Sequence, residues 1–146
     1  MLLQDRVAFV TGAGSGIGRA GALAMAAEGA LVVVTDRDGD RARAVADEIA
    51  GAGGRAEARA LDVTDDAALA AAISRTAAGH GRLDILHSHA GIQIPGRLEE
   101  VTPEQMDASW QLNVRSHFVA ARAAMPVMKA RGKGSIIITA SNSGVQ

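Results

Sequence analysis

The stretch Thr11-Gly12-Ala13-Gly14-Ser15-Gly16-Ile17-Gly18 decides the fold of this 146-residue chain. It follows the apolar run 7–11 and opens an Ala-rich segment of helical period that reaches Glu28. Glycines at such a turn permit positive φ and let backbone N–H groups approach a ligand. The helix N-terminus beyond it favours a diphosphate. We therefore expect nucleotide contacts here, where the alternative is a tight turn without a ligand. They would come from Gly12, Ser15, Gly16, Ile17 and Gly18.

Short β-branched runs alternate with helical segments along the rest of the chain. The runs 32–34 and 136–138 are unbroken Val or Ile, which is typical of parallel strands covered on both faces. The expected strands are 7–11, 31–35, 55–61, 83–88 and 135–139. Such alternation predicts right-handed crossovers and a Rossmann-type, doubly wound parallel sheet of the α/β class. No linker divides residues 1–146, so we expect one domain.

The helices between these strands carry recognisable ends. We expect helices over 17–28 and 39–50, and one from an N-cap at Thr64 to about Ala78. Thr102-Pro103-Glu104-Gln105 has the pattern of a capping box with proline in the first turn. The helix that it begins should run, with a kink, to Met128.

The amino-acid composition excludes some classes of binding partner and favours one cellular compartment. The net charge of −1 offers no basic field for a nucleic acid or an acidic membrane. With 0 cysteines the chain has no disulfide framework, which fits a cytoplasmic location. Asp5 and Arg6 interrupt the stretch where a signal peptide would be apolar, and no run is long enough to span a bilayer. We expect neither nucleic-acid nor membrane partners.

An acidic residue ends the second expected strand. Asp36 stands near the spacing at which a carboxylate accepts the ribose hydroxyls of a dinucleotide and repels a 2′-phosphate. This favours NAD over NADP. Arg37 follows directly, and its guanidinium could pair with such a phosphate, so NADP is the less favoured alternative. Asp36 could also be an ordinary solvated loop acid.

The order Thr-Gly-x-x-x-Gly-x-Gly at 11–18 resembles the short-chain dehydrogenase/reductase family, in its cofactor-binding part. Four later segments agree in order and spacing across the chain. They are Asp62-Val63, Ala90-Gly91, Leu112-Asn113-Val114 and Gly134-Ser135-Ile136 with Ser141 and Gly144 beyond. The resemblance implies hydride transfer between NAD(H) and a small alcohol or carbonyl substrate. It also implies that Asp62 and Val63 hold the adenine edge and that His89, Ala90 and Gly91 border the cofactor.

The same resemblance implies roles for two polar residues. Ser141 would hydrogen-bond and polarise the substrate oxygen, with Ser143 a weaker candidate for substrate contact. Asn113 would keep a helix distorted and a water in place. The alternatives are a turn serine and a polar residue at a helix junction.

Two departures from the family pattern stand out. The first is Ser88-His89 where the family carries two asparagines, which leaves the contact with the cofactor ribose in question. His87 and His89 project to one side of a strand, but two ligands make a poor metal site. We therefore expect no metal, and a buried histidine satisfied by backbone groups.

The second departure is the missing Tyr-x-x-x-Lys motif. The chain contains 0 tyrosines, and Lys129 and Lys133 both precede the Ser135 strand. We therefore expect the N-terminal cofactor-binding part of a longer oxidoreductase, inactive alone, with a sheet incomplete on its C-terminal side. The alternative is a non-catalytic dinucleotide-binding fragment or pseudoenzyme. An S-adenosylmethionine methyltransferase is a third possibility, which Thr11 before Gly12 disfavours.

Large apolar side chains recur on the last expected helix. Trp110, Val114, Phe118, Ala121 and Met125 should mostly pack in the core. In the family that this chain resembles, the corresponding helix also pairs with its symmetry mate, which implies a homodimer or homotetramer of the complete protein.

Overall fold

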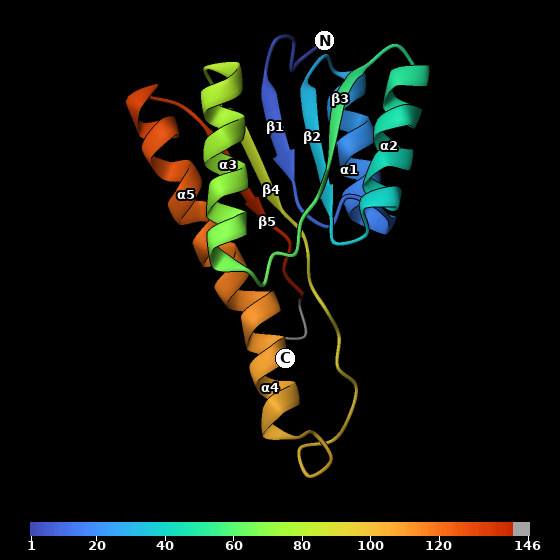
Figure 1. The fold of residues 1–146 in the computed structure, drawn as a ribbon, viewed down its shortest axis with the longest axis vertical. Coiled ribbons are helices and arrows are strands. Elements are labelled where there is room, and N and C mark those ends of the chain that lie inside the picture. The colour runs from blue at the N-terminus through green and yellow to red at the C-terminus, as the bar shows by residue number, and fades with distance from the viewer. Residues whose placement is uncertain (142–146) are drawn as a thin grey trace.

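A computed structural model describes residues 1–141 of the chain. In this range a parallel sheet with the strand order β3-β2-β1-β4-β5 lies between two layers of helices (Figure 1). The strands are β1 Val7–Val10, β2 Leu31–Asp36, β3 Arg55–Ala60, β4 Ile85–Ser88 and β5 Ser135–Ile138. The helices are α1 Gly16–Ala27, α2 Gly39–Gly51, α3 Asp66–His80, α4 Pro103–Trp110, the π-helix η1 Gln111–Arg115 and α5 Ser116–Ala130. The predicted doubly wound fold is confirmed.

Each central strand contributes to two apolar cores, one on each face of the sheet. Phe9 of β1 belongs to the core beneath α3 and α5, whereas its neighbours Ala8 and Val10 belong to the core beneath α1 and α2. Val33 of β2 lies in the first core, between residues that lie in the second. Successive side chains of a strand point to opposite faces, so a run of unbroken valines fits a sheet covered on both sides.

The helix termini confirm one sequence prediction and correct another. In the capping box, the Gln105 N–H donates to Thr102 Oγ1 at 3.2 Å and the Thr102 N–H donates to Gln105 Oε1 at 2.9 Å. The predicted N-cap at Thr64 was wrong, because the Asp65 carboxylate accepts from the Ala68 N–H at 2.9 Å. The Thr64 hydroxyl instead donates to Asp62 Oδ1 at 2.7 Å.

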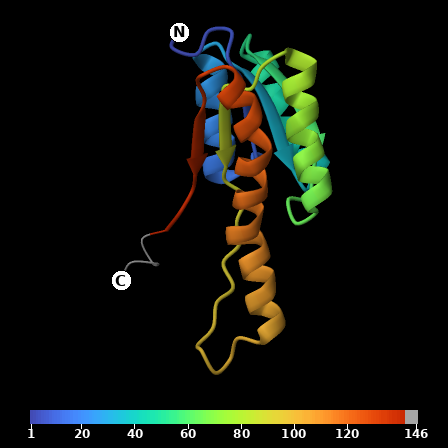
Figure 2. The same ribbon diagram turned by 90° about the vertical axis from the view of Figure 1, so that its left-hand side faces the viewer.

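The long last helix contains the predicted irregularity. α4 continues without a break into η1 and then α5, so the distortion is one turn of π-helix rather than an interruption. Figure 2 shows α4 and the loop before it extending beyond the body of the domain, with β5 at one edge of the sheet. Within residues 1–141, none of the helices has the length and apolar character that crossing a bilayer requires.

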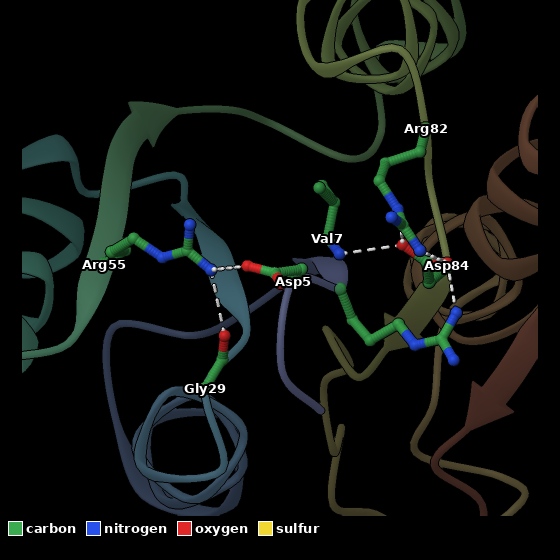
Figure 3. Close-up of polar contacts among 7 residues, drawn as sticks. Asp5, Val7, Gly29, Arg55, Arg82 and Asp84 are labelled. Atoms are coloured by element: carbon green, nitrogen blue, oxygen red, sulfur yellow. Dashed lines mark hydrogen bonds and ion pairs between the residues drawn. The ribbon is translucent and has the colours of Figure 1, made fainter. Parts of the chain in front are cut away.

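Charged groups tie the strands together where they begin, along what we call the amino edge of the sheet. Buried Asp84 accepts hydrogen bonds from the Val7 N–H at 2.9 Å, from Arg82 at 2.7 and 2.8 Å and from Arg6 at 3.3 Å (Figure 3). Burial alone would raise the pKa of Asp84, but the bonds from Arg82, Val7 and Arg6 outweigh it and lower that pKa to about 2. The carboxylate therefore stays charged and fixes β1 against β4.

A second contact of this kind joins the starts of β2 and β3. Arg55 donates to the Gly29 carbonyl oxygen at 3.1 Å and to Asp5 Oδ1 at 3.4 Å (Figure 3). Both side chains are largely exposed, so this ion pair adds little stability. Its geometry nevertheless continues the line of arginine contacts along the amino edge.

Candidate functional site

A cavity of about 640 Å³ opens at the opposite, carboxyl edge of the sheet, where β1, β2 and β4 end. It is lined by residues from four separate segments that the sequence analysis had singled out. They are Gly12, Ser15, Gly16, Ile17, Asp36, Arg37, Asp62, Val63, His89, Ala90 and Gly91. Every predicted cofactor contact except Gly18 therefore lies on the wall of one cavity. Ligands of doubly wound sheets bind at this edge.

Two glycines let the turn pack tightly on its surroundings. Gly12 has φ +63°, and a Cβ there would lie 2.9 Å from Ala90 Cα. Gly18 lies beneath the cavity rather than on its wall. A Cβ at Gly18 would overlap the Gly12 carbonyl oxygen and come within 2.8 Å of His89 Cδ2. The turn, α1 and the end of β4 can approach one another only because these side chains are absent.

Asp36 is held at one end of the cavity by backbone groups. Its Oδ2 accepts from the Gly14 N–H at 3.0 Å, and its Oδ1 accepts from the Asp38 N–H at 3.0 Å. A Cβ at Gly14 would lie 2.8 Å from Asp36 Oδ2, so glycine is needed for the first bond. Arg37 and Arg41 line the cavity beside this carboxylate. This end thus offers one fixed acceptor and two cations.

Asp62 and Val63 form another part of the wall. The Asp62 carboxylate accepts from the hydroxyl and the N–H of Thr64, and these bonds lower its pKa. The same loop is tied to η1, because Gln111 Nε2 donates to the Thr64 carbonyl oxygen at 3.0 Å. Arg115 also pairs with Asp66, its Nε lying 2.8 Å from Oδ2. The π-helix and the Asp62 loop are therefore held as one unit.

Asn113 lies in η1 and uses its whole side-chain amide on nearby groups. Its Oδ1 accepts from the Ile92 N–H at 2.8 Å, and its Nδ2 donates to the Ile92 carbonyl oxygen at 2.8 Å and to Ser109 Oγ at 3.1 Å. This pins the chain leaving β4 to the π-helix. The predicted helix distortion thus occurs at Asn113, next to the cavity residues Gly91 and Ile92.

Ser141 lies three residues beyond β5, is exposed, and is not among the residues that line the cavity. Ser143 and Gly144 lie outside the described residues.

The histidines at the end of β4 bond to hydroxyl groups, so the prediction of backbone partners was wrong. Thr139 Oγ1 lies 2.8 Å from His89 Nδ1 and 3.2 Å from His87 Nε2. Ser88 Oγ lies 2.6 Å from Nδ1 of His117, a residue of α5. These hydroxyls meet the rings because β4 and β5 are neighbours and α5 crosses behind them.

Burial lowers the pKa of all three of these histidines, and the charge of His89 lowers the pKa of His87 and His117 further. The rings are therefore neutral at pH 7. Within residues 1–141, no group of three His, Asp or Glu side chains is placed to hold a metal ion.

Two site residues escaped the sequence analysis. Arg41 lines the cavity, and Gln111 supports the Asp62 loop. Arg41 could have been found, since it falls in the first helical turn after the strand that ends at Asp36. Gln111 carried no such signal, because its role depends on where the π-helix lies relative to the Asp62 loop.

Comparison with known proteins gives consistent matches along the chain. The family model of the short chain dehydrogenases matches residues 6–146. Versicolorin reductase 1 of Aspergillus parasiticus is 42% identical over 142 residues, which are 97% of this chain and 53% of that protein. 2,3-Dihydro-2,3-dihydroxybenzoate dehydrogenase of Bacillus subtilis is 33% identical, over 97% of this chain and 54% of its own length. The chain thus spans about half the length of these relatives.

Two solved structures share the fold closely. A 7α-hydroxysteroid dehydrogenase complexed with NADH and 7-oxo glycochenodeoxycholic acid superimposes with a TM-score of 0.94 at 34% identity, covering 99% of this chain and 56% of that one. A metagenomic short-chain oxidoreductase in complex with NADP gives a TM-score of 0.92 at 40% identity, covering 97% of this chain and 64% of that one. The two neighbours carry different cofactors, so likeness alone does not choose between NAD and NADP.

Proposed function

This chain belongs to the short-chain dehydrogenase family, and from that premise we propose that its carboxyl-edge cavity binds a nicotinamide dinucleotide. The chain would form the cofactor-binding part of an oxidoreductase acting on a small alcohol or carbonyl compound. We propose that these 146 residues bind the dinucleotide without turnover, because the sequence holds no tyrosine to serve as proton donor.

The glycine turn is the observation that carries this proposal. The space at Gly12 and Gly18 is closed to any side chain, while the cavity above the turn remains open. Backbone N–H groups at the start of α1 can therefore approach an anionic ligand closely, in the positive end of the helix dipole. A diphosphate has the size and charge for that position.

We assign the preference for NAD to Asp36. Its carboxylate is fixed by the N–H groups of Gly14 and Asp38, so it cannot readily turn away from the cavity. A fixed anion there accepts ribose hydroxyls and repels a 2′-phosphate. Arg37 and Arg41 favour NADP in the same place, which makes Asp36 the residue to test.

Two more residues have proposed roles in the complete reaction. A bound nicotinamide supplies the hydride donor or acceptor. Ser141 would donate a hydrogen bond to the substrate oxygen. Asn113 would keep the chain after β4 in place through its two bonds to Ile92.

Calorimetric titration with NADH, NADPH and S-adenosylmethionine tests the proposal. We expect one NADH per chain, weaker NADPH and no heat from S-adenosylmethionine. In Asp36→Ala the preference for NADH should disappear, whereas Asp40→Asn, an exposed change on α2 outside the cavity, should keep it. Tighter binding of NADPH than of NADH by the unmodified chain would overturn the assignment to Asp36. If the unmodified chain bound neither NADH nor NADPH, the proposed function itself would be contradicted.

An exposed apolar stripe supports a further proposal, that two copies of the chain associate. Trp110, Val114, Phe118 and Met125 are 57%, 43%, 66% and 42% exposed, so the prediction that they pack in the core was wrong. They recur at helical spacing along α4, η1 and α5, facing away from the sheet. We propose that a second copy covers this stripe, as the family resemblance implies. Sedimentation should show a dimer or tetramer that Phe118→Asp dissociates, and a monomer at all concentrations would contradict it.

A further inference from the structure

A single hydroxyl group links two imidazole rings, and one of these rings, that of His89, lines the cavity. Thr139 Oγ1 lies 3.2 Å from His87 Nε2 and 2.8 Å from His89 Nδ1. Thr139 follows β5 directly, and its N–H donates to the Ser88 carbonyl oxygen at 3.2 Å, which holds it against the end of β4. The proposed function assigns no task to Thr139 or His87.

The buried Nδ1 atom of His87 determines which ring nitrogen carries the proton. His87 is 8% exposed, and its Nδ1 is a buried atom without a hydrogen-bond partner in the described part of the chain. α1 closes over this atom, since a Cβ at Gly21 would lie 3.2 Å from it. A buried N–H without an acceptor is rarer and costlier than a buried lone pair. The proton of the neutral ring therefore lies on Nε2.

The proton on His87 then sets the direction of the next bond. His87 Nε2–H donates to Thr139 Oγ1, which leaves the hydroxyl hydrogen available to donate to His89 Nδ1. The reverse direction would place a proton on His87 Nδ1, where no acceptor lies. When His89 accepts this hydrogen at Nδ1, its own proton lies on Nε2.

We propose that His87 and Thr139 are positioning residues that hold His89 in its Nε2–H tautomer, so that His89 presents a hydrogen-bond donor to an acceptor oxygen of the bound nucleotide. His89 lines the cavity beside Gly12 and Ala90. Unlike Nδ1 of His87, the Nε2 atom of His89 is not a buried atom that lacks a hydrogen-bond partner. The identity of the ligand rests on the proposed function, whereas the tautomer does not.

Nitrogen-15 NMR of the imidazole rings tests the tautomer without any ligand, because protonated and bare ring nitrogens differ widely in chemical shift. We expect protonated Nε2 and bare Nδ1 on both His87 and His89 at pH 7.5. Thr139→Val should leave His89 with mixed tautomers, and Thr139→Ser should restore the single form. A proton on His89 Nδ1 in the unmodified chain would overturn the proposal, as would a spectrum unchanged by Thr139→Val.

Nucleotide titration tests the consequence. Loss of one oriented hydrogen bond predicts roughly fivefold weaker NADH binding in Thr139→Val and nearly full affinity in Thr139→Ser. Thr76→Val is the matched control, because the Thr76 hydroxyl donates to the Ala72 carbonyl oxygen in α3, away from the cavity. Equal NADH affinity in Thr139→Val and in the unmodified chain would overturn the donor role of His89.

Shorter ligands identify the acceptor. A loss seen already with ADP assigns the hydrogen bond to a diphosphate oxygen, and a loss seen with ADP-ribose but not ADP assigns it to the second ribose. Either result supports the donor role. If the unmodified chain bound no dinucleotide, the proposed function would fail, while the NMR result would still decide the tautomer.

Discussion

The two edges of the sheet are built from the same strands but treat polar groups in opposite ways. At the amino edge, Asp84 is buried and satisfied by Arg6, Arg82 and the Val7 N–H. At the carboxyl edge, backbone and side-chain groups around the glycine turn face a cavity of about 640 Å³. The difference supports our proposal that the carboxyl edge binds the cofactor, whereas the contacts at the amino edge stabilise the fold. Substitutions at the two edges should therefore have separable effects.

The largest effect on binding is expected from Gly18→Ala. The added methyl group would overlap the Gly12 carbonyl oxygen and push on His89, displacing the turn. We expect NADH affinity to fall about a hundredfold or more, equivalent to about 2.7 kcal/mol. Titration of NADH measures it.

Gly79→Ala is the control for Gly18→Ala. Gly79 lies in α3 with nothing near the position of the added Cβ, so this change should raise stability slightly and leave binding unaltered. If Gly18→Ala bound NADH with an affinity close to that of Gly79→Ala, the proposed role of the glycine turn in binding would be contradicted.

Asp84→Asn should have the opposite effects to Gly18→Ala. It should lower the free energy of unfolding and leave NADH affinity unchanged. The pKa of Asp84 is about 2 in the folded chain against 3.8 for an ordinary Asp, so its ionisation contributes about 2 kcal/mol at neutral pH. Urea denaturation should show that loss, with NADH affinity within about twofold of normal.

The pH dependence of Asp84→Asn follows from the same pKa. A folded pKa below the unfolded one gives stability that is complete above about pH 4 and lost as the pH falls towards 2. The difference between the unmodified chain and Asp84→Asn should therefore shrink across that range. A constant difference would contradict the role given to the charged carboxylate.

The buried histidines should give the smallest effect, at mildly acidic pH. Burial lowers the folded pKa of His87 and His117 below the ordinary value of 6.5. The unfolded chain then binds more protons, so stability is complete above pH 6.5 and declines as the pH falls below it. Urea midpoints should decline less steeply in His117→Gln than in the unmodified chain. Equal slopes in His117→Gln and in the unmodified chain would contradict the assignment.

Most of the fold and most residues of the cavity wall could be predicted from the sequence, because these features depend on local sequence patterns. The valines of β2 and the glycines at 12, 16 and 18 each specify a strand or a turn within a few residues. Asp36 could be placed because it directly follows a strand that the pattern defines.

What the sequence missed depends on contacts between distant segments. The partner of His87 and His89 is Thr139, 52 and 50 residues away, and nothing local indicates that pairing. Trp110 and Phe118 lie on a helix with apolar residues around much of its surface, so the pattern did not say which face meets the sheet. The sequence predicted Thr64 as the N-cap of α3, but Thr64 bonds to Asp62 and Asp65 caps the helix instead.

A crystal structure of the chain grown with NADH would test the central claim most directly. We predict the diphosphate against the Gly12–Gly16 turn, with the adenosine ribose beside Asp36 and His89 Nε2 within hydrogen-bond distance of a ligand oxygen. A dinucleotide seated anywhere other than the carboxyl edge, or a cavity that NADH leaves empty at saturating concentration, would contradict the account.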